Sequence, residues 1–116
     1  MATNEIFDSA VRSDGDLAGV FEYDGESGYF YLYKTEGGQG HKIIDSIHIL
    51  SGEPDFTEAD VLVRWDTEEE KVGFFIRGVL WAIFDSHDYT GHGGNYRPDA
   101  KPGLLPEVVR GFGIVL

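Results

Sequence analysis

The side chains best suited to chemistry are gathered in one glycine-rich stretch, residues 85–99. Imidazole and carboxylate groups are ligands of divalent transition metals, so His87 and His92 with Asp85 or Asp88 form a candidate metal site. A histidine whose ring is oriented by a carboxylate can also act as a general base, and a small hydrolytic enzyme is therefore an alternative use of the same residues.

The spacing of these residues argues against both uses. It matches no metal-ligand signature, such as two histidines one helical turn apart with a glutamate between them. Ser86, His87 and Asp88 are adjacent, and because neighbours on an extended segment point to opposite faces, they cannot form a catalytic triad among themselves. The sequence therefore favours a solvated polar loop, and with it a protein without a metal, a cofactor or an enzymatic activity.

The other histidines and the glycine-rich runs supply no stronger site. His48 lies in an apolar segment and is expected to be half-buried, whereas His41 follows a glycine-rich loop and is expected to be exposed. Residues 37–40 and 91–94 lack both the Lys-Ser/Thr pair of a phosphate-binding loop and the strand-loop-helix unit of a dinucleotide site. We expect their glycines to serve turns and bulges.

A second candidate site is the aromatic run at residues 29–33. Alternation predicts that Phe30 and Leu32 face the core while the tyrosines lie on the opposite face. Stacking of nucleic-acid bases requires a positive groove, and Lys34 is the only cation near these rings. The row is then expected either to pack against a second sheet, which is the favoured alternative, or to form a protein-binding surface. That candidate surface comprises Tyr29, Tyr31, Tyr33, Glu22, Asp24 and Glu26.

Strand signals dominate the chain, and strands must therefore position any site. The aromatic and β-branched runs 17–23 and 29–34 flank a polar turn and predict a β-hairpin. Residues 42–50 predict a strand, with a short helix as the alternative. A three-stranded antiparallel meander, with the pair Arg77-Gly78 as its second turn, is predicted for residues 61–66, 71–76 and 79–85.

The length of 116 residues suits a single domain, residues 1–116. We predict a mostly β fold of six to eight strands, in which an antiparallel sheet forms a small sandwich or partial barrel. A β-rich α+β fold is the alternative. Short helices are expected near residues 56–60 and 104–110, and a final strand at 111–116. Residues 86–103, between the predicted strand 79–85 and the predicted helix 104–110, are expected to form a loop long enough to be functional or disordered.

Charge and composition exclude several classes of function. The net charge is −12, and a surface of that sign repels nucleic-acid phosphates and anionic lipid. The chain has no cysteine, which excludes zinc fingers and cysteine nucleophiles. Because no apolar run reaches the roughly 20 residues of a membrane helix and no secretory signal is visible, we expect a cytoplasmic protein. Residues 1–70 carry 17 acidic and 4 basic side chains, and the remaining residues are nearly neutral.

The stretch from Gly28 to Asp85 resembles a family of small bacterial proteins of unknown function. The matching segments are GYFYLY at 28–33, IDSIHI at 44–49 and VRWDTEEEKVGFFIRGVLWAIFD at 63–85, within a stretch that is half of the chain. They are patterns of packing, and the family has no assigned activity to carry over. In size, acidity and strand content it is similar to bacterial immunity proteins and other small binding proteins, which implies a binding function by analogy.

Three functions are therefore weighed, in order of preference. The first is a protein-binding module that docks a basic protein partner, either as an immunity protein does or in regulation. The second is a structural or oligomer-forming domain without a ligand, with Val79–Phe84 and the apolar C-terminal end as its contact surface. The third is the metal-binding or hydrolytic enzyme. The sequence leaves open whether the protein is a monomer or a homodimer.

Overall fold

The computed structural model describes residues 5–35, 42–104, 109 and 112, which form an almost entirely β structure. Its elements are β1 (Ile6–Val11), β2 (Leu17–Tyr23), β3 (Ser27–Lys34), β4 (Lys42–Ser51), the 3-10 helix η1 (Glu58–Asp60), β5 (Val61–Trp65), β6 (Lys71–Ile76), β7 (Val79–Asp85) and β8 (Gly91–Gly93). The first four strands form sheet A and the other four form sheet B, each an antiparallel meander in sequence order. The prediction of a mostly β, antiparallel sandwich is confirmed.

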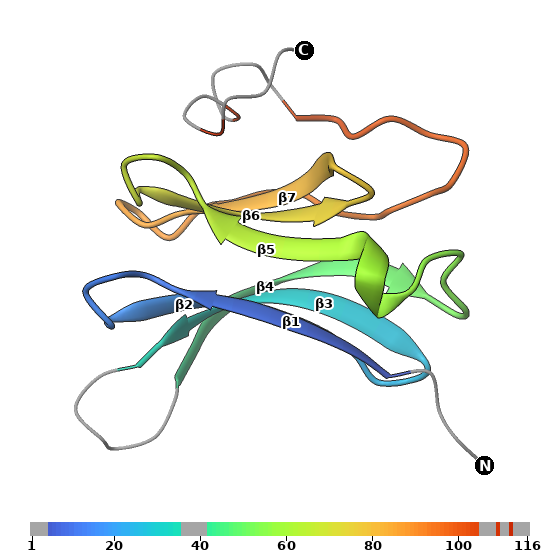
Figure 1. Ribbon diagram of the computed structural model, residues 1–116, viewed down its shortest axis with the longest axis horizontal. Coiled ribbons are helices and arrows are strands. Elements are labelled where there is room, and N and C mark those ends of the chain that lie inside the picture. Colours follow the sequence, from blue (N-terminus) through green and yellow to red (C-terminus); the bar gives the residue numbers. More distant parts are fainter. Residues whose placement is uncertain (1–4, 36–41, 105–108, 110–111, 113–116) are drawn as a thin grey trace.

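The two sheets lie face to face, with the blue to green sheet A below the green to orange sheet B in Figure 1. Alternation along each strand sends apolar side chains into the layer between the sheets. At its centre Phe21 of β2 stacks on Phe74 of β6 with ring centroids 4.1 Å apart, and Phe30 of β3 lies 5.8 Å from Phe74. A Cβ atom at Gly19 would be 2.5 Å from Cγ2 of Val72, so glycine allows β2 to approach β6.

One edge of the sandwich is joined by polar contacts between β1 and β5. The backbone N–H of Val63 donates a hydrogen bond of 2.7 Å to the carboxylate of Asp8, and the indole N–H of Trp65 donates one of 3.0 Å to the carbonyl of Ala10. The Arg12 guanidinium lies over the Trp65 ring, 5.3 Å from its centroid. An edge strand exposes unpaired backbone groups that can pair with another chain. These contacts give a hydrogen-bond partner to one backbone group of β5 and to one of β1.

The opposite edge is joined by the residues that follow β8. The backbone N–H groups of Asn95 and Tyr96 donate to the carbonyls of His48 and Ile49, over 2.9 and 2.6 Å. Strand β4, the edge of sheet A, is thereby tied to the chain that leaves sheet B. The long loop predicted at residues 86–103 therefore contains both a short strand and the segment that joins the two sheets.

The outer faces of the two sheets differ in their covering. On sheet B a second apolar cluster covers the outer face and consists of Phe75, Leu80, Ile83, Leu104, Val109 and Phe112. In Figure 1 the orange stretch after β8 begins at the level of β6 and β7, and its later part turns onto the side of sheet B that faces away from sheet A. Within the described part of the chain, no element lies over the outer face of sheet A. Sheet A therefore presents a sheet face to solvent.

Two strands were not predicted. In β1 the inward Ile6 is followed by the outward Phe7, so apolar residues on both faces mask the alternation. Strand β8 has three residues, and two of them are glycine. It is too short for the alternation of apolar and polar residues to be recognised. The helical alternative for residues 42–50 is wrong, because β4 pairs with β3 through Lys42–Ser51.

The remaining predictions at this level have mixed outcomes. The helical turn near residues 56–60 is confirmed as η1, and the meander at 61–85 is confirmed as β5–β7. The helix at 104–110 and the strand at 111–116 fall largely outside the described residues. Of the helices in the described residues, none has the length and apolar character needed to cross a membrane.

The side chain of Asp8 allows a test of the β1–β5 junction. Asp8→Ala leaves the partly buried N–H of Val63 without an acceptor. We expect the free energy of unfolding, measured by urea denaturation, to fall by about 1–3 kcal/mol. Asp8→Asn keeps an oxygen acceptor and should lose less. The control is Asp14→Ala in the exposed β1–β2 turn, and an Asp8→Ala variant as stable as this control would contradict the role of the bond.

Candidate functional site

The exposed face of sheet A is made of alternate residues of its four strands. We call this surface the tyrosine face, and it comprises Phe7, Ser9, Val11, Ala18, Val20, Glu22, Tyr29, Tyr31, Tyr33, Ile43, Ser46 and His48. The strand register sets these side chains in rows across the sheet. In one row Tyr29 lies between Glu22 and His48, and in the next Tyr31 lies between Val20 and Ser46.

The three tyrosines form a continuous column along β3. The ring centroids of Tyr29 and Tyr31 are 6.0 Å apart, and those of Tyr31 and Tyr33 are 5.9 Å apart. As the alternation predicts, Phe30 and Leu32 point the other way and are fully buried. The favoured interpretation, that the tyrosines pack against a second sheet, is wrong. Sheet B covers only the opposite face, and all three tyrosines are half-buried by their neighbours within sheet A.

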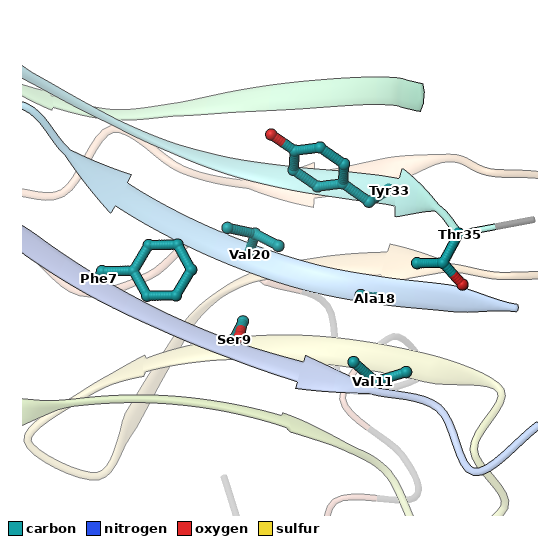
Figure 2. Close-up of a pocket in the computed structure, with 7 residues that line it drawn as sticks. All are labelled: Phe7, Ser9, Val11, Ala18, Val20, Tyr33 and Thr35. Carbon is teal, nitrogen blue, oxygen red and sulfur yellow. The ribbon is translucent and has the colours of Figure 1, made fainter. Parts of the chain in front are cut away.

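Apolar side chains extend the tyrosine column on both sides. Phe7 is 52% exposed, Val11 is 58% exposed and Ile43 is 49% exposed. Phe7, Val11, Val20 and Tyr33 project from the same side of sheet A in Figure 2 and, with Ser9, Ala18 and Thr35, they surround a shallow hollow of about 290 Å³. Large apolar side chains are thus left in solvent over a continuous part of the sheet.

Sequence patterns did not identify the apolar members of this face. Phe7 and Val11 belong to β1, a strand that was not predicted. Ile43 belongs to the strand predicted at residues 42–50, but the sequence did not indicate which of its side chains face the core. The apolar pairs at residues 6–7 and 10–11 could have indicated an apolar outer face. Adjacent residues of a strand point to opposite sides, so apolar pairs place apolar side chains on both faces of the sheet. Only the register of β1 on β2 places Phe7 and Val11 beside the tyrosines.

Hydroxyl groups and carboxylates add polar character to the face. Burial raises the pKa of the Tyr31 hydroxyl, and the negative charge of Glu22 raises it further. The Tyr31 hydroxyl is therefore protonated at neutral pH and can donate a hydrogen bond. Glu22 itself is exposed and lies across from Phe7 on one side and Tyr29 on the other.

The β2–β3 turn places two more carboxylates at one end of the tyrosine face. The Asp24 carboxylate accepts hydrogen bonds of 2.9 Å from the backbone N–H groups of Ser27 and Glu26. These bonds favour the ionised group and lower the pKa of Asp24. The carboxylate of Glu26 is exposed on the same turn. All three acidic residues predicted for the binding surface thus lie along β2 and its turn.

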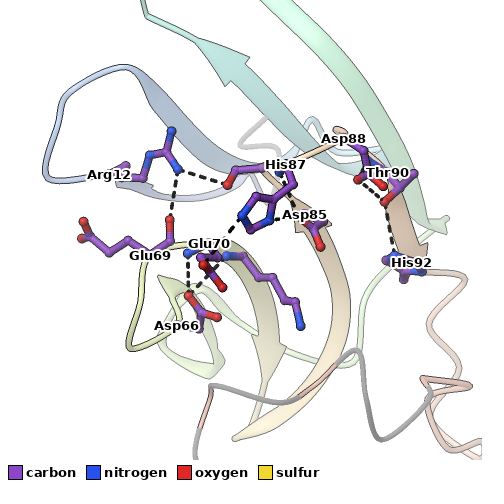
Figure 3. Close-up of polar contacts among 11 residues, drawn as sticks. Arg12, Asp66, Glu69, Glu70, Asp85, His87, Asp88, Thr90 and His92 are labelled. Carbon is purple, nitrogen blue, oxygen red and sulfur yellow. Dashed lines mark hydrogen bonds and ion pairs between the residues drawn. The ribbon is translucent and has the colours of Figure 1, made fainter.

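The predicted metal or catalytic residues divide into two separate groups (Figure 3). In the first, Nδ1 of His87 is 3.0 Å from a carboxylate oxygen of Asp85, and its Nε2 is 3.7 Å from Glu70. The neighbouring Ser86 hydroxyl bonds to Arg12 at 3.1 Å and not to His87. The imidazole is therefore held between two carboxylates at an exposed turn, and among the described residues no hydroxyl is bonded to it.

The second group lies further along the loop. The Thr90 hydroxyl donates a 2.6 Å hydrogen bond to Asp88, which lowers the pKa of that carboxyl group. Nε2 of His92 is 3.5 Å from the same hydroxyl. His87 and His92 thus have different carboxylate neighbours, and within residues 5–35, 42–104, 109 and 112 no three histidine or carboxylate side chains are arranged to hold a metal ion.

His48 is the histidine that belongs to the candidate surface. Its ring contacts Tyr29 edge-on at 5.3 Å, with Nδ1 3.1 Å from the Asn95 side chain and Nε2 2.9 Å from the Ser51 hydroxyl. Both ring nitrogens therefore have partners, as expected for a half-buried histidine. His41 lies outside the described residues.

Comparison with known proteins places the chain without giving it an activity. Residues 1–104 match the model of the family described as "Uncharacterized protein conserved in bacteria (DUF2251)". No curated protein and no solved structure matches the chain. The match includes every residue of the tyrosine face and of the stretch 85–99, which we call the histidine loop.

The turn beside the tyrosine face gives a pH-dependent prediction. The pKa of Asp24 is lowered from 3.8 in the folded protein, so its ionised form stabilises the fold above that pH, and this contribution is lost as the pH falls through the folded pKa. Wild type and Asp24→Asn share all other titrating groups. We expect wild type to be the more stable at pH 7 in urea denaturation, and the difference to close below about pH 4. A difference independent of pH would refute the assignment.

Proposed function

Since the chain belongs to this bacterial family without an assigned activity, its function has to be inferred from its own surface, and we propose that it is a protein-binding module. The tyrosine face is the binding surface, and a basic protein is the partner. The observation that carries the proposal is the difference between the two outer faces, because one is covered by the chain's own residues and the other is left apolar and exposed.

The exposed apolar side chains support a contact with another protein. Soluble monomers rarely leave large contiguous apolar patches in water, and such patches commonly mark interaction sites. Phe7, Val11 and Ile43 are each about half exposed on the same side of sheet A. Burying them against a partner would remove this apolar area from water and would stabilise the complex.

The tyrosine column is suited to recognition rather than to adhesion alone. Tyrosine offers a large contact area with few rotatable bonds, so little side-chain entropy is lost on binding. Tyr29, which stacks on the Tyr31 ring, and Tyr33, which meets it edge-on, restrict that ring before any partner arrives. Its protonated hydroxyl can then donate a hydrogen bond that selects the orientation of the partner.

Charge determines the class of partner. Glu22, Asp24 and Glu26 lie along one end of the face, and the whole chain carries a net charge of −12. A basic protein is attracted by this field, whereas a second copy of the chain is repelled. The setting we propose is the bacterial cytoplasm, with the protein acting as an immunity protein or as a regulator of a basic enzyme.

Self-association has less support. The segment suggested for it, Val79–Phe84, lies in β7 between β6 and β8, and only Val79 is exposed. The remaining residues of that segment are occupied by the core and by the cluster over sheet B. Sedimentation of the purified protein distinguishes this function, because a stable dimer at low ionic strength would favour it over a basic partner.

The apolar part of the face is tested by capture from a lysate of the source bacterium. Phe7→Ser with Ile43→Ser removes two exposed apolar groups of the tyrosine face. The matched control is Leu62→Ser with Val79→Ser, which removes groups of similar exposure, 48% and 46%, from sheet B. We expect wild type and control to retain a protein with an excess of lysine and arginine, and the tyrosine-face variant to bind it at least about tenfold more weakly.

Three outcomes of the capture experiment count against the proposal. In the first, no protein is retained. In the second, the retained protein is acidic. In the third, the retained protein binds the tyrosine-face double variant and the control double variant equally well. The affinity is measured on the isolated partner by calorimetry, so that a contaminant of the lysate is not mistaken for a ligand.

The acidic end of the face is tested separately by kinetics. Glu22→Gln with Glu26→Gln should lower the association rate constant for the captured partner about three- to tenfold at low salt, because steering by charge acts mainly on association. The same variant should weaken the dependence of that rate constant on ionic strength. Glu68→Gln with Asp99→Asn removes the same charge from exposed positions outside sheet A and is the control. Equal effects in the two variants would assign the attraction to net charge alone.

A further inference from the structure

A second hollow, on the opposite sheet from the tyrosine face, has a different character. It has a volume of about 240 Å³ and lies between the β6–β7 hairpin and the segment 96–102. Among the described residues, its lining consists of Ile76, Arg77, Val79, Trp81, Tyr96, Arg97, Pro98, Ala100, Lys101 and Pro102. Three of these residues are cations and none is acidic, although the protein as a whole carries 21 acidic and 9 basic residues.

A β-bulge places Trp81, a core residue that is 5% exposed, in the lining of this hollow. Phe74 of β6 pairs with Ala82 and Phe75 pairs with Leu80, so Trp81 is left over as the extra residue of β7. Bulges redirect side chains and are over-represented near functional sites. The ring of Trp81 meets that of Tyr96 edge-on, with centroids 4.8 Å apart.

The cations around the rings are of two kinds. Arg77 has a positive φ of 50° in the hairpin turn, and its side chain lies 3.6 Å from Asp55 and 3.7 Å from Asp60. Arg97 and Lys101 differ, because their side chains make no hydrogen bond or ion pair with any other described residue. The segment that carries them includes Pro98 and Pro102, whose rings fix φ and restrict the backbone of the wall.

We propose that this hollow binds a small organic anion with a flat apolar body, of the aromatic carboxylate class. The guanidinium of Arg97 and the ammonium of Lys101 would hold the carboxylate, and the apolar body would lie against Trp81 and Tyr96. The proposal is independent of the tyrosine face, since all of the lining residues belong to sheet B or follow it.

The ligand class is tested by titrating the full-length protein with benzoate, followed by amide and indole NMR signals. The protein contains two tryptophans, Trp65 and Trp81, which give two indole N–H signals. We expect benzoate to shift the Trp81 signal and to leave the Trp65 signal in place, because Trp65 lies at the β1–β5 junction. Benzamide has the same shape without the charge and should bind at least about tenfold more weakly.

Arg97 and Lys101, the two cations of the hollow without a partner among the described residues, are tested by Arg97→Gln with Lys101→Gln. This variant should weaken benzoate binding about tenfold while leaving the weak binding of benzamide unchanged. Lys42→Gln on sheet A is the control and should bind as wild type does. Because Arg97 and Lys101 are exposed, the variant should keep the urea midpoint of the wild type. The proposal is overturned if benzoate moves no Trp81 signal up to about 10 mM, if benzamide binds as tightly, or if the double variant binds normally.

Discussion

The stacking of Phe21 on Phe74 is the contact on which the other features of this protein depend. Each meander has one apolar face that it cannot bury alone, and the ring centroids, 4.1 Å apart, mark where the two faces meet. A sandwich of this kind uses one face of each sheet, so the two outer faces must be covered or left in solvent. The chain covers sheet B with its own Leu104, Val109 and Phe112. The tyrosine face is what remains, and it exists because no described residue covers sheet A.

The sequence predicts the parts of this arrangement that depend on neighbours along the chain. The alternation of residues 29–33 correctly separates Phe30 and Leu32 from the tyrosines. The pair Arg77-Gly78 correctly predicts a hairpin, and both residues have the positive φ that a two-residue turn with this twist requires. Such signals are local, since a pleated strand has a period of two and a tight turn has a fixed backbone geometry whatever the rest of the fold does.

Properties that depend on pairing between distant segments could not be predicted. Alternation assigns the tyrosines to one face of β3, but which face meets sheet B follows only from the packing of β2 on β6. Similarly, the run 79–85 predicts a strand and gives no sign that Trp81 is its bulge, because the extra residue is defined by the register on β6. Both candidate sites depend on the pairing of segments that are distant in the sequence. Residue types alone do not reveal such pairing, and they pointed instead to the histidine loop.

The unequal distribution of charge along the chain also takes a form that the sequence does not reveal. The acidic residues of the first 70 positions are spread over sheet A, the segment before η1 and the turn before β6, so they surround the molecule rather than forming one patch. The cations of the later part are concentrated instead, with Arg77, Arg97 and Lys101 around a single hollow. A ligand that suits the acidic end of the tyrosine face is therefore disfavoured at that hollow, and the reverse holds for an anion. Two separate sites of opposite charge, the acidic end of the tyrosine face and the cationic hollow, would allow one chain to hold a basic protein and a small anion at the same time.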